Sequence, residues 1–244
     1  MSSAEVPRIE FSLSGLADLL EGFVDLGYRS VAFGDADPSA AHLLLRHDVD
    51  LDLRSAVRVA EVEHSMGVGA TYFLMVRSDC YNVLDRSCMT AARHLVELGH
   101  RIGLHLDASL YPPDDLAAAG AEERRILEWA VDAPVGIVSF HRPAPHLVGS
   151  RDGGFGVPHT YEPRFTEHIT YVADSRGTFR FGSPFDTDAY RERRALQLLL
   201  HPLWWAGDVA DGTETRLRAL VSDHHLRFAN RVADNCRPYQ EMIR

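Results

Sequence analysis

The chain has 244 residues, 45% of them hydrophobic, and its 35 acidic and 25 basic side chains give a formal charge of -10. This length can bury the core of one α/β domain, so a single domain over residues 1–244 is predicted. The acidic balance, without a basic run, argues against a nucleic-acid partner.

The sequence contains neither an export signal at its start nor the roughly 18 consecutive apolar residues of a membrane span. A cytoplasmic protein without membrane contact is therefore expected. Three cysteines, Cys80, Cys88 and Cys236, form no Cys-x-x-Cys pair. They are predicted to be reduced thiols.

Hydrophobic periodicity predicts helices and strands that alternate along the chain. In order, these are a helix over 12–27, a strand over 42–46, a helix over 53–66, a strand over 70–74, a helix over 84–98, a strand over 102–106, a helix over 112–129, strands over 136–140, 169–173 and 196–200, and a helix over 213–232. The Gly- and Pro-rich stretch 149–168 is predicted to be a long loop or lid. Repeated strand–helix units favour a parallel sheet, most simply a (β/α) barrel over 41–205, with a helical lead-in over 1–40 and a C-terminal helix within 206–244.

Two carboxylates follow the first buried strand, in Arg46-His47-Asp48-Val49-Asp50. Aspartates one residue apart repel each other when both are ionised, and a divalent cation relieves that repulsion. The other strands end in polar residues too: His105 and Asp107, His141 and Arg142, Asp174, and His201. Because the carboxyl ends of parallel strands meet at one rim, these side chains are predicted to share a metal site.

These residues, in this order, resemble the polysaccharide deacetylase or NodB-homology group, carbohydrate esterase family 4, from about Leu43 to Trp205. The resemblance implies a distorted (β/α) barrel of the NodB type and a metal-dependent N-deacetylase. His47-Asp48-Val49-Asp50 is similar to the first motif, which implies that Asp48 is the general base and Asp50 a metal-binding carboxylate.

Gly99-His100-Arg101-Ile102-Gly103-Leu104-His105 resembles the second motif, which makes His105 a metal ligand. The family has a second histidine four residues further on, where this chain has Ser109. Candidates for the missing ligand are His141, Asp107, Ser109 through water, and His159; His141 is preferred because it ends a neighbouring strand. One divalent ion is expected, Zn²⁺ first because of the histidines, with Co²⁺, Ni²⁺ or Mn²⁺ as alternatives.

The third motif resembles Phe140-His141-Arg142-Pro143, which implies that Arg142 orients the base. The resemblance also implies an oxyanion donor, a backbone N–H just after this arginine. Pro143 and Pro145 have no backbone N–H, which leaves Ala144 as the nearby donor. Tyr171-Val172-Ala173-Asp174-Ser175 and Leu199-Leu200-His201 are similar to the last two motifs. They imply that Asp174 tunes His201, which acts as the general acid.

The expected substrate is a small N-acylated amino sugar or sugar-containing metabolite, contacted by the aromatic side chains of Tyr161, Trp204 and Trp205. Core or subunit packing is the alternative for the two tryptophans. Two other functions stay open: a metal-dependent amidohydrolase acting on a cyclic imide or ureide, and a non-catalytic carbohydrate-binding protein. A homo-oligomer is compatible with the sequence.

Overall fold

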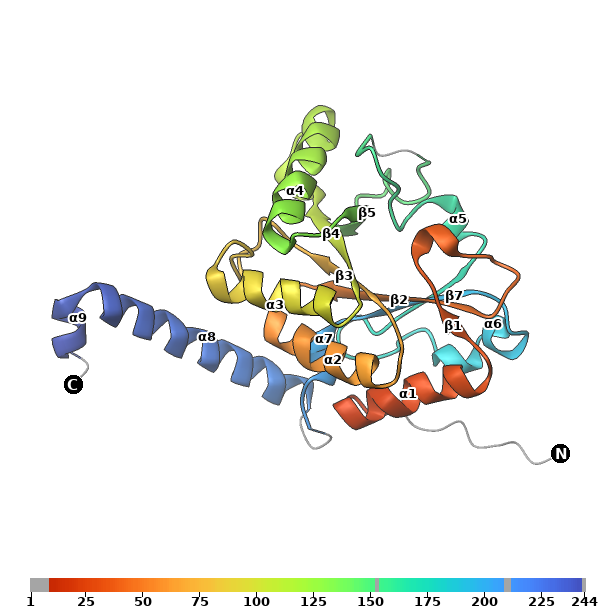
Figure 1. Cartoon of the computed structure of the whole chain (residues 1–244), viewed down its shortest axis with the longest axis horizontal. Coiled ribbons are helices and arrows are strands. Elements are labelled where there is room, and N and C mark those ends of the chain that lie inside the picture. Colours follow the sequence, from red (N-terminus) through yellow and green to blue (C-terminus); the bar gives the residue numbers. More distant parts are fainter. Residues whose placement is uncertain (1–8, 152–153, 209–211, 243–244) are drawn as a thin grey trace.

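The computed structural model describes residues 9–151, 154–208 and 212–242, and a parallel β-sheet lies at its centre (Figure 1). Its strands are β1 (Arg29–Ser30), β2 (His42–Val49), β3 (Thr71–Leu74), β4 (Arg101–Asp107), β5 (Val135–His141), β6 (Thr170–Ala173) and β7 (Leu196–Leu200). Hydrogen bonds order them β5-β4-β3-β2-β7-β6, and β1 pairs with the start of β2. All of these pairings are parallel, so the carboxyl ends of the strands lie at one edge.

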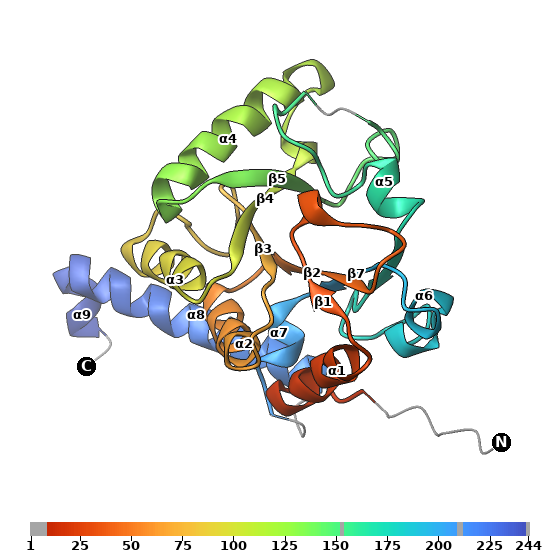
Figure 2. The same cartoon turned by 45° about the vertical axis from the view of Figure 1, so that its right-hand side comes forward.

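The sheet curves but does not close by hydrogen bonds (Figure 2). Within the described residues, no ladder joins β5 to β6, the two ends of the path. The chain between them runs beside β5 instead, where His159 and Val138 form an isolated parallel bridge. The predicted α/β fold is confirmed, as a distorted barrel that is incomplete between β5 and β6.

Helices connect the strands and pack on the outside of the sheet (Figure 1). The longer ones are α1 (Leu13–Asp25), α2 (Leu53–Ser65), α3 (Arg86–Glu97), α4 (Leu116–Val131) and α8 (Thr213–Asn235); α5 (Pro163–Thr166), α6 (Asp188–Arg191), α7 (Pro202–Trp205) and α9 (Arg237–Met242) are short. The helix α1 begins where Ser12 Oγ accepts a hydrogen bond from the Gly15 N–H at 3.0 Å, a side-chain cap of an otherwise unpaired donor. Likewise, Asp52 Oδ2 caps α2 by accepting from the Ser55 N–H at 2.9 Å.

Each long element predicted from periodicity is present, with ends that differ by a few residues. Three-residue 3-10 turns lie at Phe33–Asp35, Ala108–Leu110, Pro113–Asp115 and Pro184–Asp186. The predicted loop over 149–168 also contains α5 and the His159 bridge. Such segments were missed because a few residues cannot display a helical or strand period.

Strand β2 is buried along its whole length and carries polar side chains on both faces. Because side chains alternate, Arg46 and Asp48 share the inner face while His47 points outward toward α2. There His47 Nε2 lies 2.6 Å from Glu63 Oε1, and the Tyr72 hydroxyl donates to Glu63 Oε2 at 2.7 Å. Glu63, His47 and Tyr72 are all inaccessible to solvent, so this pairing ties α2 to the sheet beneath the rim.

The helix α8 projects away from the barrel (Figure 1) and, among the described residues, contributes none to the two hydrophobic clusters. The buried Arg216 anchors its first turn by donating to the Asp208 carbonyl at 2.8 Å.

In the described part of the chain, no helix combines the length and apolar character needed to cross a membrane. The three cysteines are free thiols, as predicted.

Candidate metal centre

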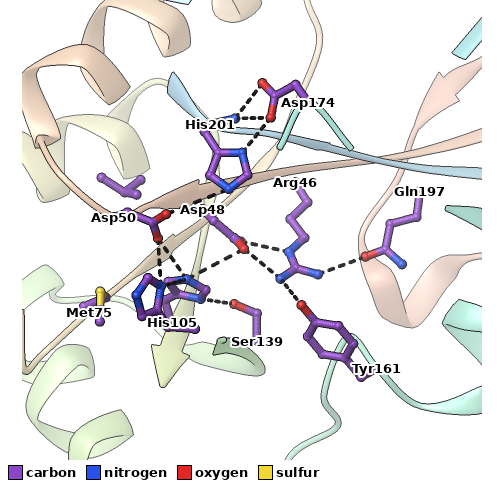
Figure 3. A network of polar contacts seen from close by, with 12 residues as sticks. Arg46, Asp48, Asp50, Met75, His105, Ser139, Tyr161, Asp174, Gln197 and His201 are labelled. Carbon is purple, nitrogen blue, oxygen red and sulfur yellow. Dashed lines mark hydrogen bonds and ion pairs between the residues drawn. The ribbon is translucent and has the colours of Figure 1, made fainter. Parts of the chain in front are cut away.

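Three side chains converge at the carboxyl edge of the sheet, from the ends of β2, β4 and β5. Figure 3 shows two of them, Asp50 and His105, pointing toward each other. His105 Nε2 lies 3.0 Å from Asp50 Oδ1, and His141 Nδ1 lies 3.3 Å from the same oxygen. The two histidine nitrogens are 3.3 Å apart. The structure therefore brings together the three residues that the sequence proposed as metal ligands.

The donor set fits a divalent cation. His105 Nδ1 lies 2.6 Å from Ser139 Oγ; an Nδ1–H donated there leaves the Nε2 lone pair facing Asp50. Asp50 Oδ1 is buried, and no well-aligned hydrogen bond reaches it from the described residues. Ligand atoms about 2.1 Å from one ion lie roughly 3.4 Å apart in a tetrahedral shell and roughly 3.0 Å apart in an octahedral one. The observed 3.0 to 3.3 Å separations fit either arrangement.

The electrostatics of the cluster favour an ionised Asp50. Burial alone would raise the pKa of the Asp50 carboxyl, but His105 and His141 hold it far below its usual range. Conversely, the close contact of His141 Nδ1 with the Asp50 carboxylate raises the pKa of His141. A carboxylate and two imidazoles held this close are the groups that a divalent metal prefers as ligands.

The other candidates for the third ligand lie elsewhere. Asp107 Oδ1 accepts hydrogen bonds from the Ser109 N–H at 3.0 Å and the Ser109 hydroxyl at 2.6 Å, and Ser109 is exposed. His159 is fully buried, with its ring centre 5.1 Å from that of Phe140. Of the four candidates, the structure groups only His141 with Asp50 and His105.

Asp48 is held by Arg46 and not by Arg142, which corrects the role inferred from the third motif. Arg46 Nε donates to Asp48 Oδ1 and Arg46 Nη2 to Asp48 Oδ2, both at 2.8 Å. Burial alone would raise the pKa of Asp48, but the Arg46 guanidinium lowers it. The Arg142 side chain is exposed, and its guanidinium makes no hydrogen bond or ion pair with any described residue. Its backbone is left-handed (φ 53°) just after β5.

His201 and Asp174 form the second pair at the rim. His201 Nδ1 lies 2.6 Å from Asp174 Oδ1, and Asp174 also accepts from the His201 N–H at 2.9 Å. Burial alone would lower the pKa of His201, but the hydrogen bond to Asp174 and the charges of Asp174, Asp48 and Asp50 raise it to about 9. His201 Nε2 faces the cluster, 3.9 Å from Asp50 Oδ2.

One of the three predicted sugar contacts is corrected. Trp205 is inaccessible to solvent and donates its Nε1–H to Asp174 Oδ2 at 2.7 Å, so it supports Asp174 from within the core. Tyr161 is half-buried, with its hydroxyl 3.5 Å from Arg46 Nη2 and its ring stacked on Phe140 at 5.8 Å, and its contact with a sugar stays a prediction. Trp204 is half-buried and lines a small cavity at the site.

That cavity has a volume of about 30 Å³, and Asp48, Asp50, His201 and Trp204 are among its lining residues. A larger groove of about 560 Å³ lies beside it and shares Leu51 and Asp52 with it. The groove extends across residues 78–88 to α8, and its lining comes from the loops that follow β2 and β3 and from α2, α3 and α8.

Sequence reasoning assigned no role to Arg46, Ser139 or Gln197. Arg46 could have been found, because a residue two positions before Asp48 shares its strand face. Ser139 and Gln197 had no such signal. Their contacts with His105 and Arg46 depend on the register between strands, which pairs His105 with Ser139 and Leu44 with Gln197.

No protein-family model matches the sequence, and no curated protein does so either. Solved structures with a similar fold include a CE4 family pseudoenzyme from Bacillus anthracis, with 15% identity and a TM-score of 0.45 over 78% of this chain and 63% of that one. This chain thus spans less than two thirds of that protein. The peptidoglycan deacetylase PdaC from Bacillus subtilis has 11% identity and a TM-score of 0.47 over 83% and 98% of the two chains. The chitin deacetylase from Colletotrichum lindemuthianum has 19% identity and a TM-score of 0.44 over 79% and 88%.

Proposed function

We propose that this chain is a metal-dependent hydrolase that removes a small N-acyl group, acetyl above all, from an amino sugar or a small sugar-containing metabolite. The observation that carries the proposal is the grouping of Asp50, His105 and His141, flanked by Asp48 on one side and His201 on the other. A ligand triad, a carboxylate and an imidazole are the parts that amide hydrolysis requires.

Asp50, His105 and His141 would hold the divalent ion, which when bound supplies a water of lowered pKa and polarises the acyl oxygen. Asp48 would accept the proton of the attacking water. Its Oδ2 lies 3.7 Å from His105 Nε2, so the carboxylate reaches the ligand cluster without belonging to it. Its lowered pKa keeps it ionised and ready to accept.

His201 would give the leaving amine its proton. An amine leaves poorly unless it is protonated, so the acid must carry its proton at neutral pH. The raised pKa of about 9 meets this need, because most of the imidazole is then protonated at pH 7. Asp174 accepts from Nδ1 and thereby directs the Nε2–H toward the site.

The size of the small cavity supports a short acyl group. A volume of about 30 Å³ corresponds to roughly two water-sized positions, enough for the oxygen and methyl of an acetyl group. The adjoining groove of about 560 Å³ is large enough for a sugar-sized remainder. Trp204 remains an aromatic candidate for contact with that sugar.

The test combines metal content with product release. The wild type, His141→Ala and the exposed control His94→Ala would each be loaded in turn with Zn²⁺, Co²⁺, Ni²⁺ or Mn²⁺, and their metal content measured by elemental analysis. Acetate release would be measured with N-acetylated monosaccharides and chito-oligomers, and ring opening with cyclic imides. We expect about one metal ion per chain and acetate release in the wild type and in His94→Ala. Both the metal ion and the acetate release should be lost in His141→Ala. Turnover of an imide alone would indicate the amidohydrolase alternative, and a metal-free, inactive wild type the binding protein.

A further inference from the structure

We propose that Arg46 is the positioning residue for the base carboxylate of Asp48, a role that rests on the proposed function. The two side chains leave the same face of β2 two residues apart, and both oxygens of Asp48 accept from the guanidinium. A fork of two N–H donors in one plane matches a carboxylate in position and orientation. Because both partners belong to one strand, the strand itself sets their spacing.

The guanidinium itself is fixed on every side. Arg46 is inaccessible to solvent, and the rings of Phe73 and Tyr161 each lie 5.2 Å from it. Its Nη1 donates to Gln197 Oε1 at 3.3 Å, and Gln197 in turn donates to the Phe165 carbonyl at 3.0 Å. Thus β3, β7 and the chain between β5 and β6 all hold Arg46 against Asp48.

This immobilisation has a catalytic consequence. A base displaced by about 1 Å can cost roughly 100-fold in rate, since the proton must be taken along a defined line. Lysine keeps the charge but offers no planar fork, so it cannot hold both oxygens of Asp48 in one plane. Arg142 is exposed and has no hydrogen bond or ion pair with Asp48, so it does not provide a second clamp.

The first experiment compares Arg46→Lys with Arg142→Lys. For Arg46→Lys, kcat is expected to fall about 100-fold while KM and metal stoichiometry stay within about twofold, because neither ligands nor substrate contacts change. Arg142→Lys is expected to lose much less. The opposite ranking of the two variants would overturn the proposal.

A double-mutant cycle separates positioning from a merely structural role. If Arg46 acts through Asp48, then Asp48→Asn with Arg46→Lys should be no slower than Asp48→Asn alone. The proposal would be contradicted if the losses in kcat of the two substitutions were additive and paralleled their losses in thermal stability. If Arg46→Lys does not fold, Gln197→Leu replaces it in the test. This substitution removes the hydrogen bond that Arg46 Nη1 donates to Gln197 Oε1 and leaves Asp48 unchanged. It is expected to lower kcat roughly tenfold at constant metal content, and an unchanged kcat would count against the clamp.

Crystal structures of the two lysine variants give a readout that needs no turnover. The Asp48 carboxylate is expected to rotate or to split into alternate conformers in Arg46→Lys, and to stay in place in Arg142→Lys. An unmoved Asp48 in Arg46→Lys would overturn the positioning role even if the wild type hydrolyses nothing. A wild type without hydrolysis would contradict the proposed function alone.

Discussion

His105 Nε2 and His141 Nδ1 lie 3.3 Å apart although the two residues come from different strands. The register between β4 and β5 places His141 opposite Asp107, two residues beyond His105. The two histidines therefore lie diagonally across one strand pair. This arrangement supplies a second imidazole without a histidine at the position of Ser109, so the candidate metal site contains two histidines and one carboxylate.

Asp50→Asn is expected to abolish metal binding, because it removes the only carboxylate of the triad. The measurement is the rise in melting temperature on adding Zn²⁺ to the metal-free protein. A wild type with the ion at 100 times its dissociation constant should gain about 2.7 kcal/mol in unfolding free energy, and Asp50→Asn should gain almost nothing. Asp48→Asn is the matched control and should keep the gain. Equal gains in wild type and Asp50→Asn would refute the ligand assignment.

His201→Ala is expected to lower kcat by roughly 100-fold to 10,000-fold, the usual contribution of a general acid. Metal stoichiometry should stay near that of the wild type, because the contact of His201 Nε2 with Asp50 Oδ2 is 3.9 Å, longer than the contacts of the triad. Steady-state kinetics and elemental analysis on one preparation check both. Loss of metal in proportion to activity would identify His201 as a ligand instead.

The site could be predicted from sequence because of parallel topology. Once Asp50, His105 and His141 were placed at the carboxyl ends of parallel strands, their meeting at one rim followed without knowledge of any loop. Roles that depend on a loop could not be predicted in this way, and the role inferred for Arg142 was wrong. Arg142 and Tyr161 lie in the connection after β5, and its path decides whether a side chain points to the rim, to solvent or into the barrel.

Trp205 shows a different limit of sequence reasoning. An aromatic pair just after a strand suits a sugar platform and a core equally well, and only the turn of α7 separates them. It buries Trp205 against Asp174 and leaves Trp204 at the cavity. The sequence pattern could not reveal this difference between Trp204 and Trp205. In a helix of four residues, neighbouring side chains point in different directions and meet different surroundings.

The rate should fall at alkaline pH as His201 loses its proton. Its pKa is raised to about 9, so kcat should be level near pH 7 and fall through pH 9. A bound cation offsets the charge of Asp50, lowers the pKa of His201 and would therefore move this alkaline limb, the fall of kcat with rising pH, to lower pH. Asp174→Asn removes the main charge that raises this pKa and should shift the limb further toward neutral pH. A limb that stays in place in Asp174→Asn would contradict the pairing.

The same pKa has a consequence for stability. A histidine with a folded pKa above its ordinary value of 6.5 favours folding while it is protonated. Its contribution is therefore complete below about pH 6.5 and disappears as the pH rises through about 9. Urea denaturation of wild type and His201→Ala at pH 6 and pH 10 measures it. The difference between the two proteins should be larger at pH 6, and a larger difference at pH 10 would show that the sign is wrong.

Glu63→Leu should destabilise the fold without removing the metal ligands. The carboxylate is inaccessible to solvent and pairs with His47 at 2.6 Å and the Tyr72 hydroxyl at 2.7 Å, so its loss leaves both without partners. Leaving a buried hydrogen-bonding group without its partner costs roughly 1 to 3 kcal/mol for each group. Glu61→Leu is the matched control on the same helix, since its side chain is 57% exposed and should change stability by less than about 0.5 kcal/mol. Urea denaturation gives both values, and equal losses for the two variants would mean that the buried pair does not hold α2 to the sheet.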